Sequence, residues 1–252
     1  MIAGLPMYDR PELREVNDDF WSAIRANLGF GPDKLSRPKN IQEFWLSREL
    51  FFGQTCGMPY RTFLHESLYL VGTPDYGLEG CAPGYYRSAV IVHSESKIHD
   101  FYELDGKNIA FNDGLSQSGW GSVIVEMQTK GLKPKRGIRT YTHESSIHAV
   151  CKREADFAAI DAHTWRLMCK YHPEITRQVR VIYLTKPTPG LPFVTAYENY
   201  AELIFEAVSK TIRTLDNVMR TNLGIKGIVC IPKNEYVEVA NPHSPSELIN
   251  QK

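Results

Sequence analysis

The residues best suited to chemistry follow a short apolar run at 108–111 and form the segment Ser116-Gln117-Ser118-Gly119. A helix that begins there would leave its first backbone N–H groups without internal partners, and its dipole would favour a negative guest. The serine hydroxyls add neutral donors. Serine is also an ordinary helix-capping residue that satisfies such N–H groups without binding anything. The segment therefore predicts either an anion-binding turn or a plain helix cap.

A similar pattern recurs about thirty residues further along the chain. The polar stretch 140–146 contains Thr142 and His143 and precedes the apolar run 147–150. Two helix N-termini of this kind are able to face one ligand. Neither segment has the GxxxxGK[ST] spacing of a nucleotide-binding loop, and no lysine follows the glycine to hold a phosphate chain. The pattern favours a small anion over a nucleotide.

Length and charge exclude several classes of protein. The 252 residues are enough for one large α/β domain or for two lobes of roughly 100 to 150 residues each. Lys and Arg number 29, as do Asp and Glu, and there is no basic block, so nucleic acid is not an expected partner. No stretch approaches the roughly 20 uncharged apolar residues of a membrane span. We expect no direct insertion into a membrane.

The five cysteines show neither a CxxC pair nor the Cys/His spacing of a zinc site, so no metal is expected. No motif indicates an organic cofactor either. Cys56 and Cys81 lie in glycine-bearing loops, which leaves open a disulfide between them in an oxidising compartment. Residues 1–10 lack the basic and apolar regions of a secretory signal. The chain as written is therefore expected to be cytoplasmic; the alternative is a periplasmic protein whose export signal has been removed.

Hydrophobic periodicity predicts the elements that position these residues. A helix is expected from Pro11 to about Leu28, because apolar residues recur at a spacing of four and glycines follow. A second long amphipathic helix is expected over 197–221. The run 155–161 is typical of a strand that ends in Asp161, at the edge where open α/β sheets bind ligands. Little order is expected near 245–252.

Several separate segments together point to a family. These are Tyr-Arg-Ser-Ala-Val-Ile-Val at 86–92, Leu-Asp-Gly-Lys-Asn-Ile-Ala-Phe at 104–111, Ser-Gln-Ser-Gly-Trp at 116–120, and the run from 142 to 161. In these the chain resembles the phosphate/phosphite/phosphonate ABC-transporter solute-binding proteins. The resemblance implies an α/β, type II periplasmic-binding-protein fold, with two lobes, a ligand cleft and two hinge crossings. Lobe 1 is then expected to hold 1–87 plus 192–252, and lobe 2 to hold 88–191.

The resemblance also implies roles for individual residues. Tyr8 and Tyr76 of the first lobe would close on the oxyanion, and Asp161 would lie near the ligand's other end. The two motifs of the second lobe would contact the oxyanion through Ser116, Gln117, Ser118, Gly119, Thr142 and His143. Leu115, Gln117 and Trp120 depart from the family pattern, so the identity of the oxyanion stays open. Trp120 is expected to pack against the loop.

The function expected from these observations is capture of a phosphonate, phosphate or phosphite for an ABC-transporter permease, without catalysis. One alternative is a cytosolic ligand sensor of the same fold. Another is an enzyme on this fold, in which His143 and Cys56 would act as base and nucleophile. No motif places that cysteine beside that histidine.

Overall fold

The structure is a computed structural model that describes residues 1–249. The chain forms two compact units, the first from Met1–Tyr85 and Pro189–Val239, and the second from Tyr86–Thr188 and 240–249. The chain passes from one unit to the other after residues 85 and 188, within a few residues of the two expected hinge crossings. The strands at these two points, β4 (Tyr85–Tyr86) and β10 (Thr188–Pro189), pair as a two-stranded sheet. A third passage follows residue 239 and differs from the expected division, which assigned 192–252 to one lobe.

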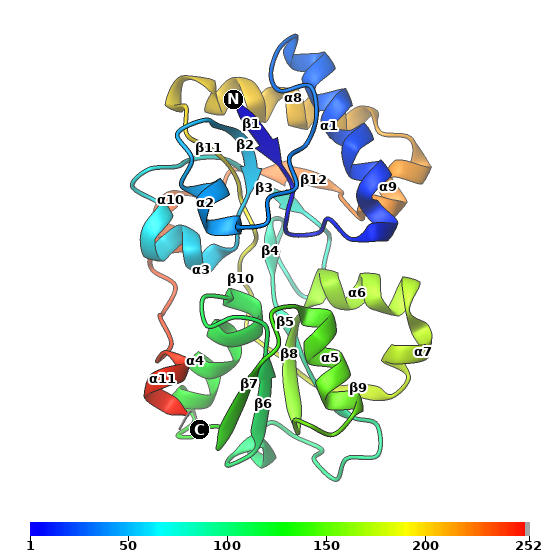
Figure 1. Ribbon diagram of the computed structural model, residues 1–252, viewed down its shortest axis with the longest axis vertical. Helices are drawn as coiled ribbons and strands as arrows, with labels where there is room; N and C mark the ends of the chain where they lie inside the picture. Colours follow the sequence, from blue (N-terminus) through cyan, green and yellow to red (C-terminus); the bar gives the residue numbers. More distant parts are fainter. Residues whose placement is uncertain (250–252) are drawn as a thin grey trace. The chain divides into compact units, whose positions relative to one another are not determined.

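The first unit is a five-stranded sheet in the order β1-β2-β11-β3-β12, with helices packed on it (Figure 1). Strands β1 and β2 are parallel, and β11 runs antiparallel to both β2 and β3, so β1, β2 and β3 point in one direction. The strands are β1 (Ile2–Gly4), β2 (Leu50–Gln54), β3 (Tyr69–Asp75), β11 (Phe193–Thr195) and β12 (Gly227–Val229). The helices are η1 (Pro11–Leu13), α1 (Arg14–Leu28), α2 (Ile41–Trp45), α3 (Gly57–Pro59), η2 (Tyr60–Leu64), η5 (Glu198–Tyr200), α8 (Ala201–Thr214), α9 (Asn217–Leu223) and α10 (Lys233–Val237).

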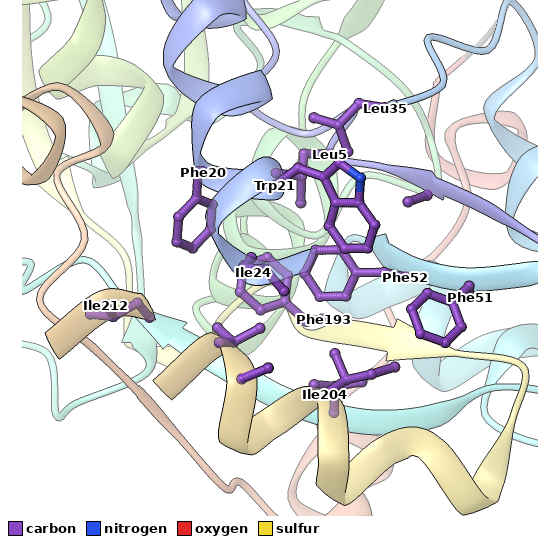
Figure 2. Close-up of a cluster of buried hydrophobic side chains, with 14 of the residues drawn as sticks. Leu5, Phe20, Trp21, Ile24, Leu35, Phe51, Phe52, Phe193, Ile204 and Ile212 are labelled. Atoms are coloured by element: carbon purple, nitrogen blue, oxygen red, sulfur yellow. The ribbon is translucent and has the colours of Figure 1, made fainter. Parts of the chain in front are cut away.

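Helices α1 and α8 bury their apolar faces against this sheet. Figure 2 shows the cluster, in which Trp21 stacks on Phe52 with ring centroids 5.3 Å apart and planes 15° apart. The expected helix ending near residue 28 is confirmed. Gly29 closes it in the left-handed conformation, φ 81°, and its N–H donates to the Arg25 carbonyl.

The single helix expected over 197–221 is wrong, because the structure divides that range among η5, α8 and α9. Leu215 leaves the helical conformation, with φ −57° and ψ 135°, and Asp216 starts α9 by accepting the Met219 N–H at 2.8 Å. Ile204, Ile212 and Met219 nevertheless pack on the same core. The apolar periodicity therefore continues across the break, and periodicity alone does not reveal it.

The second unit is built on a five-stranded sheet in the order β7-β6-β8-β5-β9. The strands are β5 (Ser88–His93), β6 (Asn108–Phe111), β7 (Arg136–Arg139), β8 (Phe157–Asp161) and β9 (Val179–Leu184). The helices are η3 (Tyr102–Leu104), η4 (Gln117–Gly121), α4 (Ser122–Thr129), α5 (His143–Cys151), α6 (Ala162–Tyr171), α7 (Pro173–Thr176) and α11 (Pro245–Leu248).

Both faces of this second sheet are covered, which explains why its central strands read as continuous apolar runs. Ile109 and Phe111 of β6 join the cluster formed with α4, whereas Ala110 between them joins the cluster formed with α5 and α6. Successive strand residues thus enter opposite cores, as the period of two requires.

The C-terminal segment packs on the second unit. Residues 245–248 form α11, and Ile249 is 3% exposed within the α4-side cluster. The expectation of little order is therefore wrong for 245–249; residues 250–252 lie outside the described part. One contact between this segment and the second unit is the hydrogen bond that Trp120 Nε1 donates to the His243 carbonyl at 2.9 Å.

Candidate functional site

The predicted residues of the second unit gather at one edge of its sheet. Strands β7, β6 and β8 are neighbours and run parallel, so their carboxyl ends meet at the same edge. A helix follows each of them: η4 and α4 after β6, α5 after β7, and α6 after β8. This is the edge at which open α/β sheets bind their ligands.

The first motif forms the start of η4, which is a π-helical turn. Ser116 caps it, since its hydroxyl accepts the Gly119 N–H at 3.0 Å. The first helical hydrogen bonds come from the N–H groups of Trp120 and Gly121, which both donate to the Ser116 carbonyl. The N–H groups of Gln117 and Ser118 precede those bonds and stand at the positive end of the turn. The structure thus shows the cap; anion binding by the same turn stays a prediction.

The second motif forms the start of α5, where the Thr142 hydroxyl caps by accepting the Ser145 N–H at 3.0 Å. Backbone hydrogen bonds tie this turn to the one after β6. Thr140 N–H donates to the Phe111 carbonyl at 2.8 Å, and Tyr141 N–H donates to the Asn112 carbonyl at 2.9 Å. Tyr141 holds a left-handed backbone, φ 68°, which is unusual for a bulky residue. The two turns are therefore fixed to each other.

Ser118 and His143, one from each motif, are in direct contact. The Ser118 hydroxyl lies 2.9 Å from His143 Nε2, although 25 positions separate them in the sequence. Ser118 is buried and the imidazole is partly buried. Burial lowers the pKa of His143 to about 4, opposed by the backbone carbonyl of Ala159. The imidazole is therefore neutral at pH 7.

This lowered pKa predicts a loss of stability in acid. Unfolded histidine, with a pKa near 6.5, binds more protons than folded His143, so its stabilising contribution is complete above pH 6.5 and falls away towards pH 4. Between pH 7 and pH 5 the loss amounts to about 2 kcal/mol. Urea unfolding at both pH values should show this extra loss in the wild type and in His148→Gln, but not in His143→Gln. Equal losses in all three proteins would contradict the assignment.

Two neighbours of this pair escaped the sequence reasoning. Asn112 Oδ1 is buried, has no hydrogen-bond partner among the described residues, and would lie 1.8 Å from a Cβ at Gly119. That Cβ would also be 3.3 Å from His143 Cε1, so only glycine fits at 119 without movement. Ser88 supports the turn from β5, donating to the Ser118 carbonyl at 2.9 Å. The sequence holds one signal for Asn112, which is the first polar residue after the apolar run of β6.

The remaining predicted residues of this unit have structural partners. Asp161 is 2% exposed and caps α6 by accepting the Thr164 N–H at 2.7 Å. Gln117 is also buried. Trp120 packs behind the loop as expected, fully buried, with its ring 4.8 Å from that of Phe111. Asp161 shares the sheet edge with the Ser118–His143 pair, and its contact with a ligand stays a prediction.

The two predicted tyrosines of the first unit contact each other. The rings of Tyr8 and Tyr76 meet edge to face with centroids 5.2 Å apart, and Gln54 Nε2 donates to the Tyr76 hydroxyl at 3.2 Å. They follow β1 and β3, and Gln54 ends β2, so all three lie at the carboxyl edge of strands that point the same way. Gln54, a buried polar residue, was missed by the sequence reasoning.

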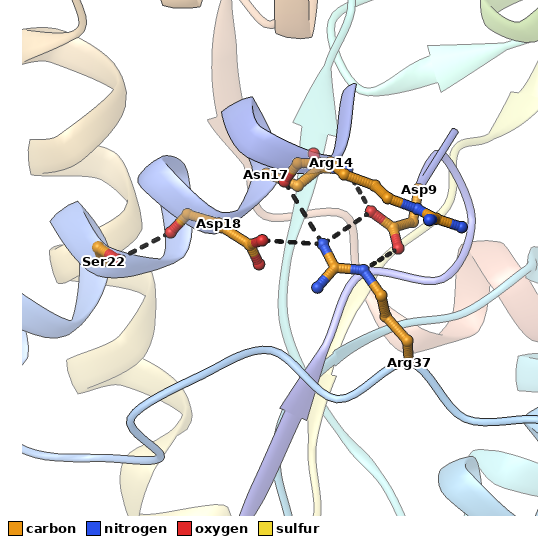
Figure 3. A network of polar contacts seen from close by, with 6 residues as sticks. All are labelled: Asp9, Arg14, Asn17, Asp18, Ser22 and Arg37. Carbon is orange, nitrogen blue, oxygen red and sulfur yellow. Dashed lines mark hydrogen bonds and ion pairs between the residues drawn. The ribbon is translucent and has the colours of Figure 1, made fainter. Parts of the chain in front are cut away.

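The chain around Tyr8 is held by an ion-pair network next to it. Arg37 Nε donates to Asp9 Oδ2 at 2.7 Å, and Arg37 Nη2 donates to Asp18 Oδ2 at 3.1 Å (Figure 3). Asn17 Nδ2 donates to Asp9 Oδ1 at 3.1 Å. The hydrogen bond to Asp9 is the main reason that the pKa of Arg37 is raised above its usual value. The network joins the loop after β1 to helix α1.

The structure also describes the cysteines, the clusters of metal-ligand residue types and the longest helices. No disulfide joins Cys56 to Cys81 in the structure. Within residues 1–249 no group of three His, Cys, Asp or Glu side chains is placed to hold a metal ion. Over the same residues, no helix has both the length and the apolar character needed to span a membrane.

Comparison with known proteins identifies the family. The family model described as "ABC transporter, phosphonate, periplasmic substrate-binding protein" matches residues 71–236. None of the curated proteins compared with the chain matches its sequence.

Solved structures resemble the whole fold. PhnD1 from Prochlorococcus marinus (MIT 9301), solved with methylphosphonate, has a TM-score of 0.73 and 14% identity, with 93% of each chain covered. A binding protein component of an ABC phosphonate transporter from Pseudomonas aeruginosa has a TM-score of 0.71 and 15% identity, covering 94% of this chain and 82% of that one. An ancestral arginine-binding protein has a TM-score of 0.57 and 17% identity, covering 82% and 85%.

At these identities the structural likeness bears on the fold alone, and the predicted fold is confirmed: the chain has the α/β fold of the type II periplasmic-binding proteins. The match to the family model spans the first two of the three passages between the units, those after residues 85 and 188. Because it covers well over half of the sequence, the chain belongs to the phosphonate-binding family of periplasmic substrate-binding proteins of ABC transporters.

Proposed function

We propose that the protein binds a small phosphonate-type oxyanion at the carboxyl edge of β6 and β7 and delivers it to an ABC-transporter permease. The observation that carries the proposal is the 2.9 Å contact between Ser118 and His143, which joins two helix N-termini. The N–H groups at these helix starts supply donors and a positive field for the anion. Family membership supports binding rather than catalysis.

In this proposal the anion is recognised through hydrogen bonds from uncharged donors. Asp113, beside the first turn, is already paired with Arg139. A small oxyanion held by N–H and hydroxyl donors gains about 1.5 to 3 kcal/mol per charge-assisted bond, so four or five such bonds suffice for micromolar affinity. The description of the family as periplasmic supports a periplasmic location, the second of the two that were expected.

An enzyme on the same fold has weaker support. A Ser–His pair resembles a nucleophile and its base, but such a base needs a third group that orients the ring. Among the described residues, His143 Nδ1 has no hydrogen-bond partner that would do so. Cys56 belongs to the first unit, whereas His143 belongs to the second.

The proposal is tested by calorimetric titration of the purified, phosphate-stripped protein with methylphosphonate, 2-aminoethylphosphonate, phosphite, phosphate and sulfate. We expect micromolar binding of at least one phosphorus oxyanion. Ser118→Ala and His143→Ala should each weaken that binding about tenfold, because each removes one polar contact at the site. Ser22→Ala, on the exposed face of α1, and His148→Ala, later on α5, are the matched controls.

Thermal melting of all four variants separates loss of a contact from loss of folding. The proposal fails if no phosphorus oxyanion binds, or if both site variants bind as tightly as their controls.

A further inference from the structure

A network of buried polar groups ties the turn after β6 (residues 116–121) to the chain just before residue 188. Ser88, the first residue of β5, is 1% exposed, and its hydroxyl donates to the Ser118 carbonyl at 2.9 Å. The same hydroxyl lies 2.9 Å from the hydroxyl of Ser122, which begins α4. The side chain of Ser88 thus holds both the turn and the start of the helix that follows it.

The backbone of Ser88 is bonded to the chain that leads out of the second unit. Its N–H donates to the Thr185 hydroxyl at 2.9 Å, and the Thr185 N–H donates to the Ser88 carbonyl at 3.0 Å. Thr185 is 1% exposed and lies just before the passage that follows residue 188. One residue therefore contacts the turn through its side chain and the chain before this passage through its backbone.

Glu126 makes a second connection, one helical turn further along α4. Its carboxylate accepts the Lys186 N–H through Oε1 and the hydroxyl of Tyr183, in β9, through Oε2 at 2.5 Å. Glu126 is 5% exposed, and burial of a carboxylate is costly unless hydrogen bonds satisfy its oxygens. Both oxygens keep their donors only while α4 holds its place against residues 183–186.

The two connections hold one continuous piece of chain, the turn and α4, at two points. Ser88 holds it at the turn, and Glu126 holds it within the helix. Both connections end on residues 183–186, and the groups that form them are buried, so a broken hydrogen bond there is not replaced by one to water without a cost. A displacement of the turn on ligand binding would therefore extend to residues 185 and 186.

We propose that Ser88 and Glu126 are positioning residues that couple occupancy of the turn to the chain at Thr185 and Lys186. The inference rests on the proposed function, because it requires an oxyanion at that turn. Neither side chain has to touch the ligand, since each acts through the turn or the helix that it holds. Loss of either connection weakens binding and also reduces the response of residues 185 and 186 to the ligand.

Amide hydrogen exchange of the wild-type protein, with and without saturating methylphosphonate, tests the coupling. We expect the ligand to slow exchange at Gln117 and Ser118, which lie in the turn. We also expect it to slow exchange at Thr185 and Lys186, whose N–H groups donate into the two connections.

Ser88→Ala and Glu126→Leu each remove one connection, and both are measured at ligand concentrations that saturate them. The slowing should persist at the amides of the turn, which shows that the ligand is bound, and should shrink by at least half at residues 185 and 186. A residue with a purely structural role would change exchange equally with and without ligand. The ligand-dependent difference therefore separates coupling from stability.

Calorimetric titration supplies the second measurement. Ser88→Ala and Glu126→Leu should bind methylphosphonate about fivefold more weakly than the wild type, as expected for one lost hydrogen bond. Glu126→Gln should stay within about twofold of the wild type, because its amide oxygen still accepts the Lys186 N–H. Thr129→Ala is the matched control, since the Thr129 hydroxyl donates within α4, to the Glu126 carbonyl at 2.9 Å. It should bind and exchange as the wild type does.

The inference is overturned if either Ser88→Ala or Glu126→Leu, shown to be folded by thermal melting, keeps the wild-type slowing at residues 185 and 186. It is also overturned if the wild type binds methylphosphonate without slowing these two amides. Should Glu126→Leu fail to fold, the result for Ser88→Ala decides. Absence of binding by any phosphorus oxyanion would instead refute the proposed function, and this inference with it.

Discussion

Gly119→Ala is expected to weaken methylphosphonate binding about 100-fold, equivalent to about 3 kcal/mol. The added methyl group would lie 1.8 Å from Asn112 Oδ1, so the asparagine must move. It would also lie 3.3 Å from His143 Cε1. Displacement of that ring breaks its 2.9 Å contact with Ser118. Overpacking in a tight site typically costs 1 to 3 kcal/mol, and here the strain falls on groups proposed to hold the ligand.

The matched control for this substitution is Gly227→Ala in β12. Position 227 has open space where its methyl group would go, with nothing within 4 Å. Calorimetric titration should therefore give wild-type affinity for the control, and thermal melting should show that both variants are folded. Wild-type affinity in a folded Gly119→Ala protein would show that the turn after β6 does not contact the ligand.

Ile249→Ala is expected to destabilise the second unit by about 3 kcal/mol, within the range of 2 to 5 for truncation of a buried isoleucine. Ile249 is 3% exposed, and its Cδ1 occupies the space above Gly137, 2.2 Å from where a Cβ would stand. It belongs to the cluster that contains Phe111 and Trp120, directly behind the proposed anion loop. The side chain thus ties a segment near the end of the sequence to the strands that form the site.

Urea unfolding measures this loss, and hydrogen exchange locates it. Amides of β6 and β7 should exchange faster in Ile249→Ala, whereas those of the first unit should be unchanged. Leu203→Ala is the control, because Leu203 is 45% exposed on α8 and its truncation should change stability by less than about 0.5 kcal/mol. A loss below 1 kcal/mol in Ile249→Ala would show that the C-terminal segment does not support the sheet.

Local patterns were enough to predict elements whose ends are marked by their own residues. Helix α1 stops at a glycine with positive φ, and β6 shows the apolar run of a strand buried on both faces. The break between α8 and α9 carried a weaker signal. Asp216 is a capping residue, but the apolar stripe continues past it because both helices lie on one core.

The C-terminal segment was mispredicted for a different reason. Prolines, serines and an asparagine over 241–246 are typical of disordered ends. The segment is ordered by partners more than a hundred positions away, such as the Trp120 indole that donates to the His243 carbonyl. No window of local sequence contains both members of such a contact.

Residue types and their local order predicted the chemistry of the candidate site: serine, threonine and histidine at two helix starts, and a family pattern that assigns them to an oxyanion. The tertiary structure decided which of these groups meet. Parallel pairing of β6 with β7 places Ser118 against His143, and it brings Asn112 beside Gly119. The physical reason is that capping depends on neighbours within a few residues, whereas strand pairing and burial depend on contacts distant in sequence. The neutral state of His143 follows from that burial and is therefore a property of the fold.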